Sequence, residues 1–142
     1  MSNPFFPENE IDWILSEFQH ILQGNAPFSM GERVTEFENI FSNYVDAKYA
    51  VGTNSCSAAL EIALRVAEVV QGDEVIIPTQ TFIATASAVV REGASPIFCD
   101  IDPQYYCMSL EQLKKKISIN TKAVILVHMG GMISPDALRI KE

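Results

Sequence analysis

From residue 48 onward, short apolar runs alternate with segments of helical periodicity, and this alternation constrains the fold more than any other feature of the sequence. It predicts strands at residues 49–51, 74–77, 96–99 and 123–127 and helices at 57–70, 82–91 and 109–117. The runs at 75–77 and 124–127 are apolar on both faces, as in strands that helices cover on each side. The pattern therefore predicts an α/β fold with a mostly parallel sheet flanked by helices.

Two amphipathic helices are expected before this region. Residues 11–22 carry apolar side chains at helical spacing with Gly24 just beyond them, and a second helix is expected to begin at Glu32. Pro27 marks the connection between them as a loop. We expect an N-terminal helix and loop at residues 1–31 and a sheet-forming domain at residues 32–142.

Composition excludes several classes of function. The chain has 142 residues, 48% of them hydrophobic, and a formal net charge of -8, which suits a globular protein and opposes a nucleic-acid surface. Its one basic cluster, Lys114–Lys116, is expected to be a solvated helix face. The odd number of cysteines without CxxC spacing predicts reduced thiols and no metal site. With no apolar run of membrane-spanning length and no secretory pattern in residues 1–10, we expect a cytoplasmic protein without membrane contact.

Residues 50–60 predict a strand, a turn of small polar residues and the start of a helix. The first amides of a helix have no intrahelical partner and lie at the positive end of its dipole, so this turn is a candidate phosphate site. The alternative is that Asn54 or Ser55 only caps the helix by accepting bonds from those amides. From this segment alone, both interpretations stay open.

Other candidate residues lie at expected strand ends, where ligands gather in parallel sheets. Phe82 is either a platform for a flat heteroaromatic ligand or a core residue. Asp100 and Asp102, with Pro103 after them, favour a structural turn over a pair of metal ligands. His128 is a candidate general base, cofactor contact or structural residue. The sequence holds no Walker A loop, GxGxxG fingerprint or GxSxG elbow.

Several short blocks follow one another in a specific order. They are Phe37-Glu38 with Phe41, Tyr-Ala-Val at 49–51, Asn-Ser-Cys-Ser-Ala-Ala-Leu at 54–60, Gly-Asp-Glu-Val-Ile-Ile-Pro at 72–78, Thr-Phe-Ile-Ala-Thr at 81–85 and Asp-Ile-Asp-Pro at 100–103. This succession resembles the DegT/DnrJ/EryC1/StrS family of pyridoxal-phosphate-dependent sugar aminotransferases. The resemblance implies part of the large domain of the aspartate-aminotransferase-like fold, the type I fold of these transferases.

The resemblance also implies roles for individual residues. The amides of Cys56, Ser57 and Ala58 and the Ser57 hydroxyl would hold the phosphate of pyridoxal 5'-phosphate, Phe82 would stack on its ring, and His128 would lie near the site. Cys56 replaces a glycine of the family, and a side chain there costs about 1 kcal/mol or more if the position needs a positive φ. Gly130 and Met132 replace a tyrosine and a glutamine of the family, close to the sugar or the cofactor.

By the resemblance, the Schiff-base lysine and the aspartate that pairs with the pyridine nitrogen lie beyond Glu142. We therefore expect a truncated N-terminal piece, inactive alone, of a homodimeric enzyme that transfers an amino group from a donor such as glutamate to a nucleotide-linked keto sugar. One alternative is a sugar dehydratase of the same family, in which another residue replaces that lysine. A second alternative is a non-catalytic remnant that binds a phosphorylated ligand or dimerises with a relative.

Overall fold

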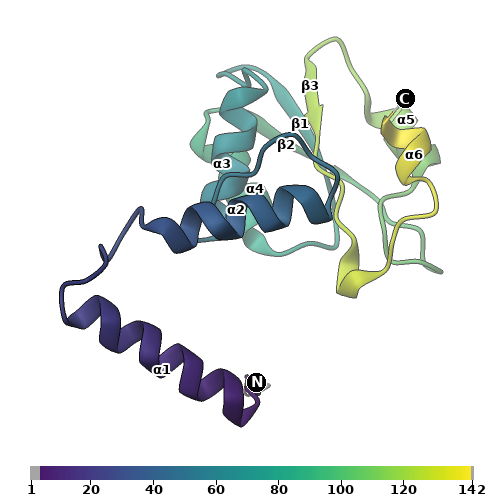
Figure 1. Ribbon diagram of the computed structural model, residues 1–142. Coiled ribbons are helices and arrows are strands. Elements are labelled where there is room, and N and C mark those ends of the chain that lie inside the picture. Colours follow the sequence, from purple (N-terminus) through teal and green to yellow (C-terminus); the bar gives the residue numbers. More distant parts are fainter. Residues whose placement is uncertain (1–3, 142) are drawn as a thin grey trace. The chain divides into compact units, whose positions relative to one another are not determined.

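The computed structural model describes residues 4–141 (Figure 1). The chain forms two compact units that divide between Gly52 and Thr53, and each is described here by itself. The expected division between residues 31 and 32 stays a prediction.

The first unit contains two helices, α1 (Glu8–Leu22) and α2 (Glu32–Tyr44), where helical periodicity predicts them. Arg33 joins them, because its guanidinium lies 2.8 Å from the Glu17 carboxylate and 5.7 Å from the centre of the Trp13 ring. The end of the unit is held by the Gly52 amide, which donates a hydrogen bond of 2.7 Å to the Glu38 carboxylate. The chain that leads to the second unit is therefore fastened to α2.

The second unit alternates helices and strands, as expected. Its elements are α3 (Cys56–Val66), β1 (Glu74–Pro78), α4 (Ile83–Arg91), β2 (Ser95–Cys99), α5 (Leu110–Lys116), β3 (Thr121–Val124), the short 3₁₀ turn η1 (Met129–Gly131) and α6 (Ala137–Lys141). The strands form a parallel sheet in the order β2-β1-β3. This confirms the predicted α/β class with a parallel sheet between helices (Figure 1).

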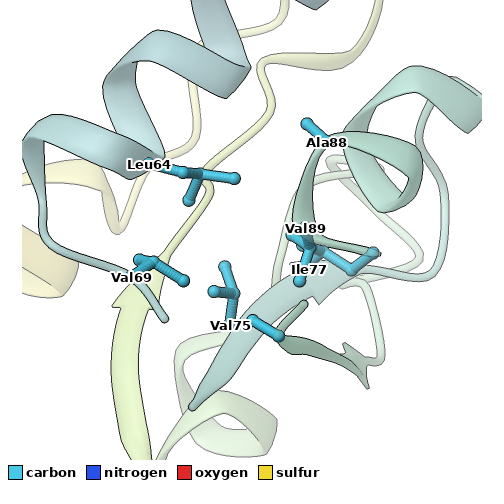
Figure 2. Close-up of a cluster of buried hydrophobic side chains, with 7 residues drawn as sticks. Leu64, Val69, Val75, Ile77, Ala88 and Val89 are labelled. Carbon is cyan, nitrogen blue, oxygen red and sulfur yellow. The ribbon is translucent and has the colours of Figure 1, made fainter. Parts of the chain in front are cut away.

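The core lies on both faces of β1, whose apolar residues are fully buried. On one face, Val75 and Ile77 pack with Leu64 of α3 and with Ala88 and Val89 of α4 (Figure 2). On the other face, Ile76 packs in a separate cluster with Met108 and with Leu110 and Leu113 of α5. Because successive strand residues point to opposite faces, the run Val-Ile-Ile supplies both cores at once.

One of the predicted strands does not form. Residues 49–51 form no strand in the structure, and the side chains of Tyr49 and Val51 are 75% and 77% exposed. A strand requires a partner along at least one edge, and a short apolar run carries no information about where that partner lies. The strand expected at residues 123–127 is displaced toward the N-terminus, because β3 spans Thr121–Val124. Beyond it, the Ile125 amide still donates a hydrogen bond of 2.9 Å to the Ile76 carbonyl oxygen of β1.

The expected solvated helix face is confirmed, because Lys114, Lys115 and Lys116 are all exposed on α5. None of the helices formed by residues 4–141 combines the length and the hydrophobicity needed to span a bilayer.

Replacing Ile76 tests the central position of β1. Because its side chain is fully buried, Ile76→Ala is expected to lower the free energy of unfolding by about 2–5 kcal/mol. Urea unfolding followed by circular dichroism measures the change. The matched control is Ile62→Ala on α3, which is 48% exposed and should cost clearly less. Equal losses in the two variants would contradict the assignment of the core.

Candidate active site

Helices α3 and α4 run side by side and begin at the same end of the sheet. Each packs against the other, and each connects to β1, with α3 before the strand and α4 after it. Arg65 in the last turn of α3 pairs with Glu92 at the end of α4 at 2.9 Å, which ties their C-terminal ends together. The N-termini of both helices therefore lie toward the carboxyl end of β1, where ligands bind in sheets of this kind.

The turn before α3 is organised by Ser55. This residue is the N-cap of the helix, and its hydroxyl accepts a hydrogen bond of 3.3 Å from the Ala58 amide. The Thr53 hydroxyl donates a bond of 3.0 Å to the Ser55 carbonyl oxygen and holds the turn from the other side. The capping interpretation is thus correct for one of the helix amides.

Two amides remain available at this N-terminus. Neither Cys56 nor Ser57 donates its backbone N–H to any other residue among 4–141. Cys56 is exposed and Ser57 is half-buried with its hydroxyl free of any such bond, so polar donors converge at the positive end of an 11-residue helix. Such a donor set suits an anionic group, and a phosphate above all.

Cys56 fits the turn without backbone strain. It is the first residue of α3 and is absent from the residues with positive φ, whereas Ser55 before it has an extended φ of -164°. Because Cys56 does not have a positive φ, the backbone strain that a side chain could cause at this position does not arise. The structure accommodates a side chain at the position where the family usually has glycine.

Phe82 lies at the start of the neighbouring helix. It is the N-cap of α4 with an extended backbone, and its side chain is 74% exposed. The alternative that Phe82 belongs to the core is wrong in this structure. Behind it, the Thr81 and Thr85 hydroxyls lie 2.8 Å apart in a hydrogen bond, which fixes the loop that presents the ring.

Asp102, which follows β2, organises a turn. The Asp102 carboxylate accepts bonds from the amides of Gln104 at 2.8 Å and Tyr105 at 3.3 Å, while the Asp102 amide donates to the Cys107 carbonyl oxygen at 2.8 Å. No group of three or more potential metal ligands occurs within residues 4–141. The structural role expected for this pair is therefore confirmed for Asp102.

His128 is an exposed residue four positions after β3, and one hydrogen bond orients its ring. Its Nδ1 accepts a hydrogen bond of 3.2 Å from the Ser134 amide, so the proton of the neutral ring is on Nε2. The Ser134 hydroxyl is buried without a partner among the described residues. None of the hydrogen bonds within residues 4–141 joins His128 to Ser57 or Phe82. The described residues thus contain no direct hydrogen bond between His128 and these two candidate site residues.

The comparisons with known proteins identify the family. Residues 9–142 match the DegT/DnrJ/EryC1/StrS aminotransferase family. The chain belongs to this family. It is 40% identical over 121 residues, 85% of its length, to a UDP-N-acetyl-3-dehydro-alpha-D-glucosamine 3-aminotransferase of Acidithiobacillus ferrooxidans, of which it covers 32%.

Two further similarities are informative. The chain is 33% identical over 90% of its length to the 3-oxo-glucose-6-phosphate:glutamate aminotransferase of Bacillus subtilis and covers 30% of that protein. The crystal structure of NtdA from Bacillus subtilis with bound cofactor PMP matches 99% of this chain and 35% of its own length, with 32% identity and a TM-score of 0.85. The chain thus spans about a third of the length of these relatives, and its fold is that of this region of a pyridoxal-phosphate-dependent aminotransferase.

Removing the cap tests the turn before α3. Ser55→Ala is expected to lower the free energy of unfolding by about 0.5–2 kcal/mol, because the Ala58 amide loses its acceptor. Ser55→Gly is the matched comparison and should cost only a few tenths of a kcal/mol, since glycine leaves the cap open to water. Thermal unfolding measures both changes. If alanine costs no more than glycine, the hydroxyl does not cap the helix.

The three thiols are expected to differ in reactivity. Cys56 is exposed, whereas Cys99 and Cys107 are buried. Burial raises the pKa of the Cys99 thiol, assisted by the neighbouring Asp100 carboxylate, so that less of the reactive thiolate forms. Titration with a thiol reagent should modify one cysteine in the folded chain and three in urea. Mass spectrometry of the peptides that finds Cys99 labelled as fast as Cys56 would contradict the structure.

Proposed function

We propose that this chain supplies the cofactor-binding part of a pyridoxal-phosphate-dependent sugar aminotransferase. The observation that carries the proposal is the pair of free amides at Cys56 and Ser57. They lie at the start of α3, within the residues that match the family. Phe82 supports it, because an exposed ring begins the adjacent helix at the same end of the sheet. The relatives named above carry out amino transfer to sugars, which makes this chemistry the expected one.

The residues present fit this cofactor. The Cys56 and Ser57 amides and the Ser57 hydroxyl would hold its phosphate, and Phe82 would cover one face of its ring. The Ala58 amide is already held by Ser55 at 3.3 Å and would take part only if that long bond yields. When bound, pyridoxal 5'-phosphate withdraws electrons from the carbon that bears the amino group. The part of this chain is to bind and orient the cofactor.

The substrate, donor and partner are proposed by analogy with the relatives. One relative is named for a UDP-linked keto sugar and another for glutamate as amino donor, so we propose a keto sugar linked to a nucleotide or phosphate and glutamate as its donor. The homodimer and the cytoplasmic location belong to the same proposal. His128 is proposed as a residue near the site. The free amides of Cys56 and Ser57 would suit the dehydratase and the non-catalytic remnant equally well, and the aminotransferase relatives are what favour amino transfer.

A titration with the cofactor tests the cradle at the start of α3. Pyridoxal phosphate added to the ¹⁵N-labelled chain is expected to shift the amide signals of Cys56 and Ser57 more than other signals. Pyridoxal without its phosphate should shift them much less, because the amides bind the phosphate. Ser57→Ala should weaken binding several-fold, whereas Ser95→Ala, at the amino end of β2, is the matched control. Equal shifts with pyridoxal and with pyridoxal phosphate would sink the proposal.

The isolated chain is expected to lack amino transfer activity. None of its lysines lies in a serine-rich segment like the family's Schiff-base site, so none of them is expected to hold the cofactor and carry protons as that lysine does. A coupled assay for 2-oxoglutarate formation from glutamate, with added pyridoxal phosphate and a keto-sugar acceptor, makes the measurement. Turnover by the purified 142-residue chain would contradict this expectation and show that one of its lysines serves as the amine.

A further inference from the structure

The block Phe37-Glu38 on α2 is a sequence feature that the proposed cradle does not yet use. The Glu38 carboxylate accepts a hydrogen bond of 2.7 Å from the Gly52 amide, which lies 14 positions later in the chain. A charged acceptor makes such a bond about twice as strong as one between neutral groups. Among residues 4–141, the Glu38 side chain has no ion pair and no other hydrogen-bond donor. Its one partner is therefore this backbone amide.

Gly52 lies close to one face of α2. A Cβ atom added to Gly52 would lie 3.4 Å from Cγ1 of Val34 and 3.5 Å from Oε1 of Glu38, which are one helical turn apart. Glu38 is half-buried there, whereas Glu36 is exposed and pairs with Arg33 at 2.7 Å. One specific side chain of α2 thus holds the Gly52 backbone.

Only two residues separate Gly52 from the N-cap of α3. The Thr53 hydroxyl donates to the Ser55 carbonyl oxygen at 3.0 Å, and the Ser55 hydroxyl donates to the Asn54 side-chain oxygen at 3.2 Å. Each of residues 52–55 therefore takes part in at least one hydrogen bond. Because the chain is continuous, a constraint on Gly52 limits the conformations that the turn and its cap can adopt.

This constraint bears on the two free amides of the cradle. Cys56 and Ser57 follow the cap directly, and a phosphate is bound best when both N–H groups point at it together. A turn that is already ordered loses less conformational entropy on binding than one that must first be ordered. The charge of Glu38 acts in the opposite direction, because a carboxylate repels an anion. Loss of the hydrogen bond and loss of the charge are therefore expected to change phosphate binding in opposite directions.

We propose that Glu38 is a positioning residue for the phosphate cradle, and that through Gly52 it holds the turn at residues 53–55 in the conformation that binds an anion. The assignment rests on the proposed function and deepens it. It gives the cradle a determinant on α2, outside the residues that would touch the cofactor. What matters at this position is the reach of the side-chain oxygen to the Gly52 amide, and the charge is secondary.

Two variants separate reach from charge. Glu38→Gln keeps an acceptor oxygen at the same reach and removes the charge, whereas Glu38→Asp keeps the charge and withdraws the oxygen by one methylene. Titration of the ¹⁵N-labelled 142-residue chain with pyridoxal phosphate gives the Kd from the Cys56 and Ser57 amide signals. Glu38→Asp is expected to raise this Kd about 3- to 10-fold, because the turn must be ordered on binding. Glu38→Gln should stay within about 2-fold of the wild type, because its amide oxygen still accepts the bond.

The matched control is Glu36→Asp, the same substitution at an exposed position of the same helix whose partner is Arg33. It should leave the Kd unchanged. Hydrogen exchange of the Gly52 amide supplies a readout that a general loss of stability would not reproduce. This exchange should accelerate in Glu38→Asp and stay slow in Glu38→Gln and Glu36→Asp. The remaining amide signals establish that each variant is folded.

Three results would overturn the assignment: an unchanged Kd in folded Glu38→Asp, equal losses in Glu38→Asp and Glu38→Gln, or an equal loss in Glu36→Asp. Inorganic phosphate, as a second probe, separates this failure from that of the proposed function. If pyridoxal phosphate shifts the Cys56 and Ser57 amides equally in the wild type and in Glu38→Asp, only the positioning role fails. If inorganic phosphate shows the expected loss in Glu38→Asp while pyridoxal phosphate shifts neither amide, the cofactor proposal fails and the positioning role stands. If neither probe shifts these amides, both proposals fail.

Discussion

The burial of β1 on both faces and along both edges is the constraint on which the second unit depends. Val75 and Ile77 enter one core and Ile76 enters the other, while β2 and β3 bond to the two edges of the strand. A shift of pairing by one residue would exchange the two faces and place each side chain in the wrong core. The position of β1 is therefore fixed, and the ends of its neighbours are fixed with it.

The fixed strand ends give the unit its chemistry. In a parallel sheet all carboxyl ends face one way, so loops that are distant in the sequence meet there. Gln80, Tyr105 and residues 129–132 meet in one cleft by this rule, and α3 and α4 begin toward the same end. The sheet that holds β1 supplies the placement of the proposed cradle, and the cleft needs one further contact, from the Cys107 thiol to the Met132 carbonyl oxygen.

Features with a local cause were predictable from the sequence. Helical periodicity and apolar runs located helices α1 to α5 and the paired strands, but not η1 or α6, and small polar residues marked the turn at Ser55. The strand expected at residues 49–51 failed because pairing depends on a distant partner. The cleft was missed because it requires the turn after β2 to lie against the loop after β3, through Cys107 and Met132. The only local sign of that turn was the aspartate before Pro103.

Capping and phosphate binding at α3 are complementary uses of one helix end. A helix begins with about four amides that lack an intrahelical partner, and a single side chain satisfies only one of them. The Ser55 hydroxyl accepts a hydrogen bond from the Ala58 amide, and the Ser55 carbonyl oxygen accepts one from the Ala59 amide. The amides of Cys56 and Ser57 are left as two adjacent unpaired donors. The cap fixes the direction in which these two amides point, so it prepares the site for an anion. A serine at this position therefore favours phosphate binding for the same reason that it stabilises the helix.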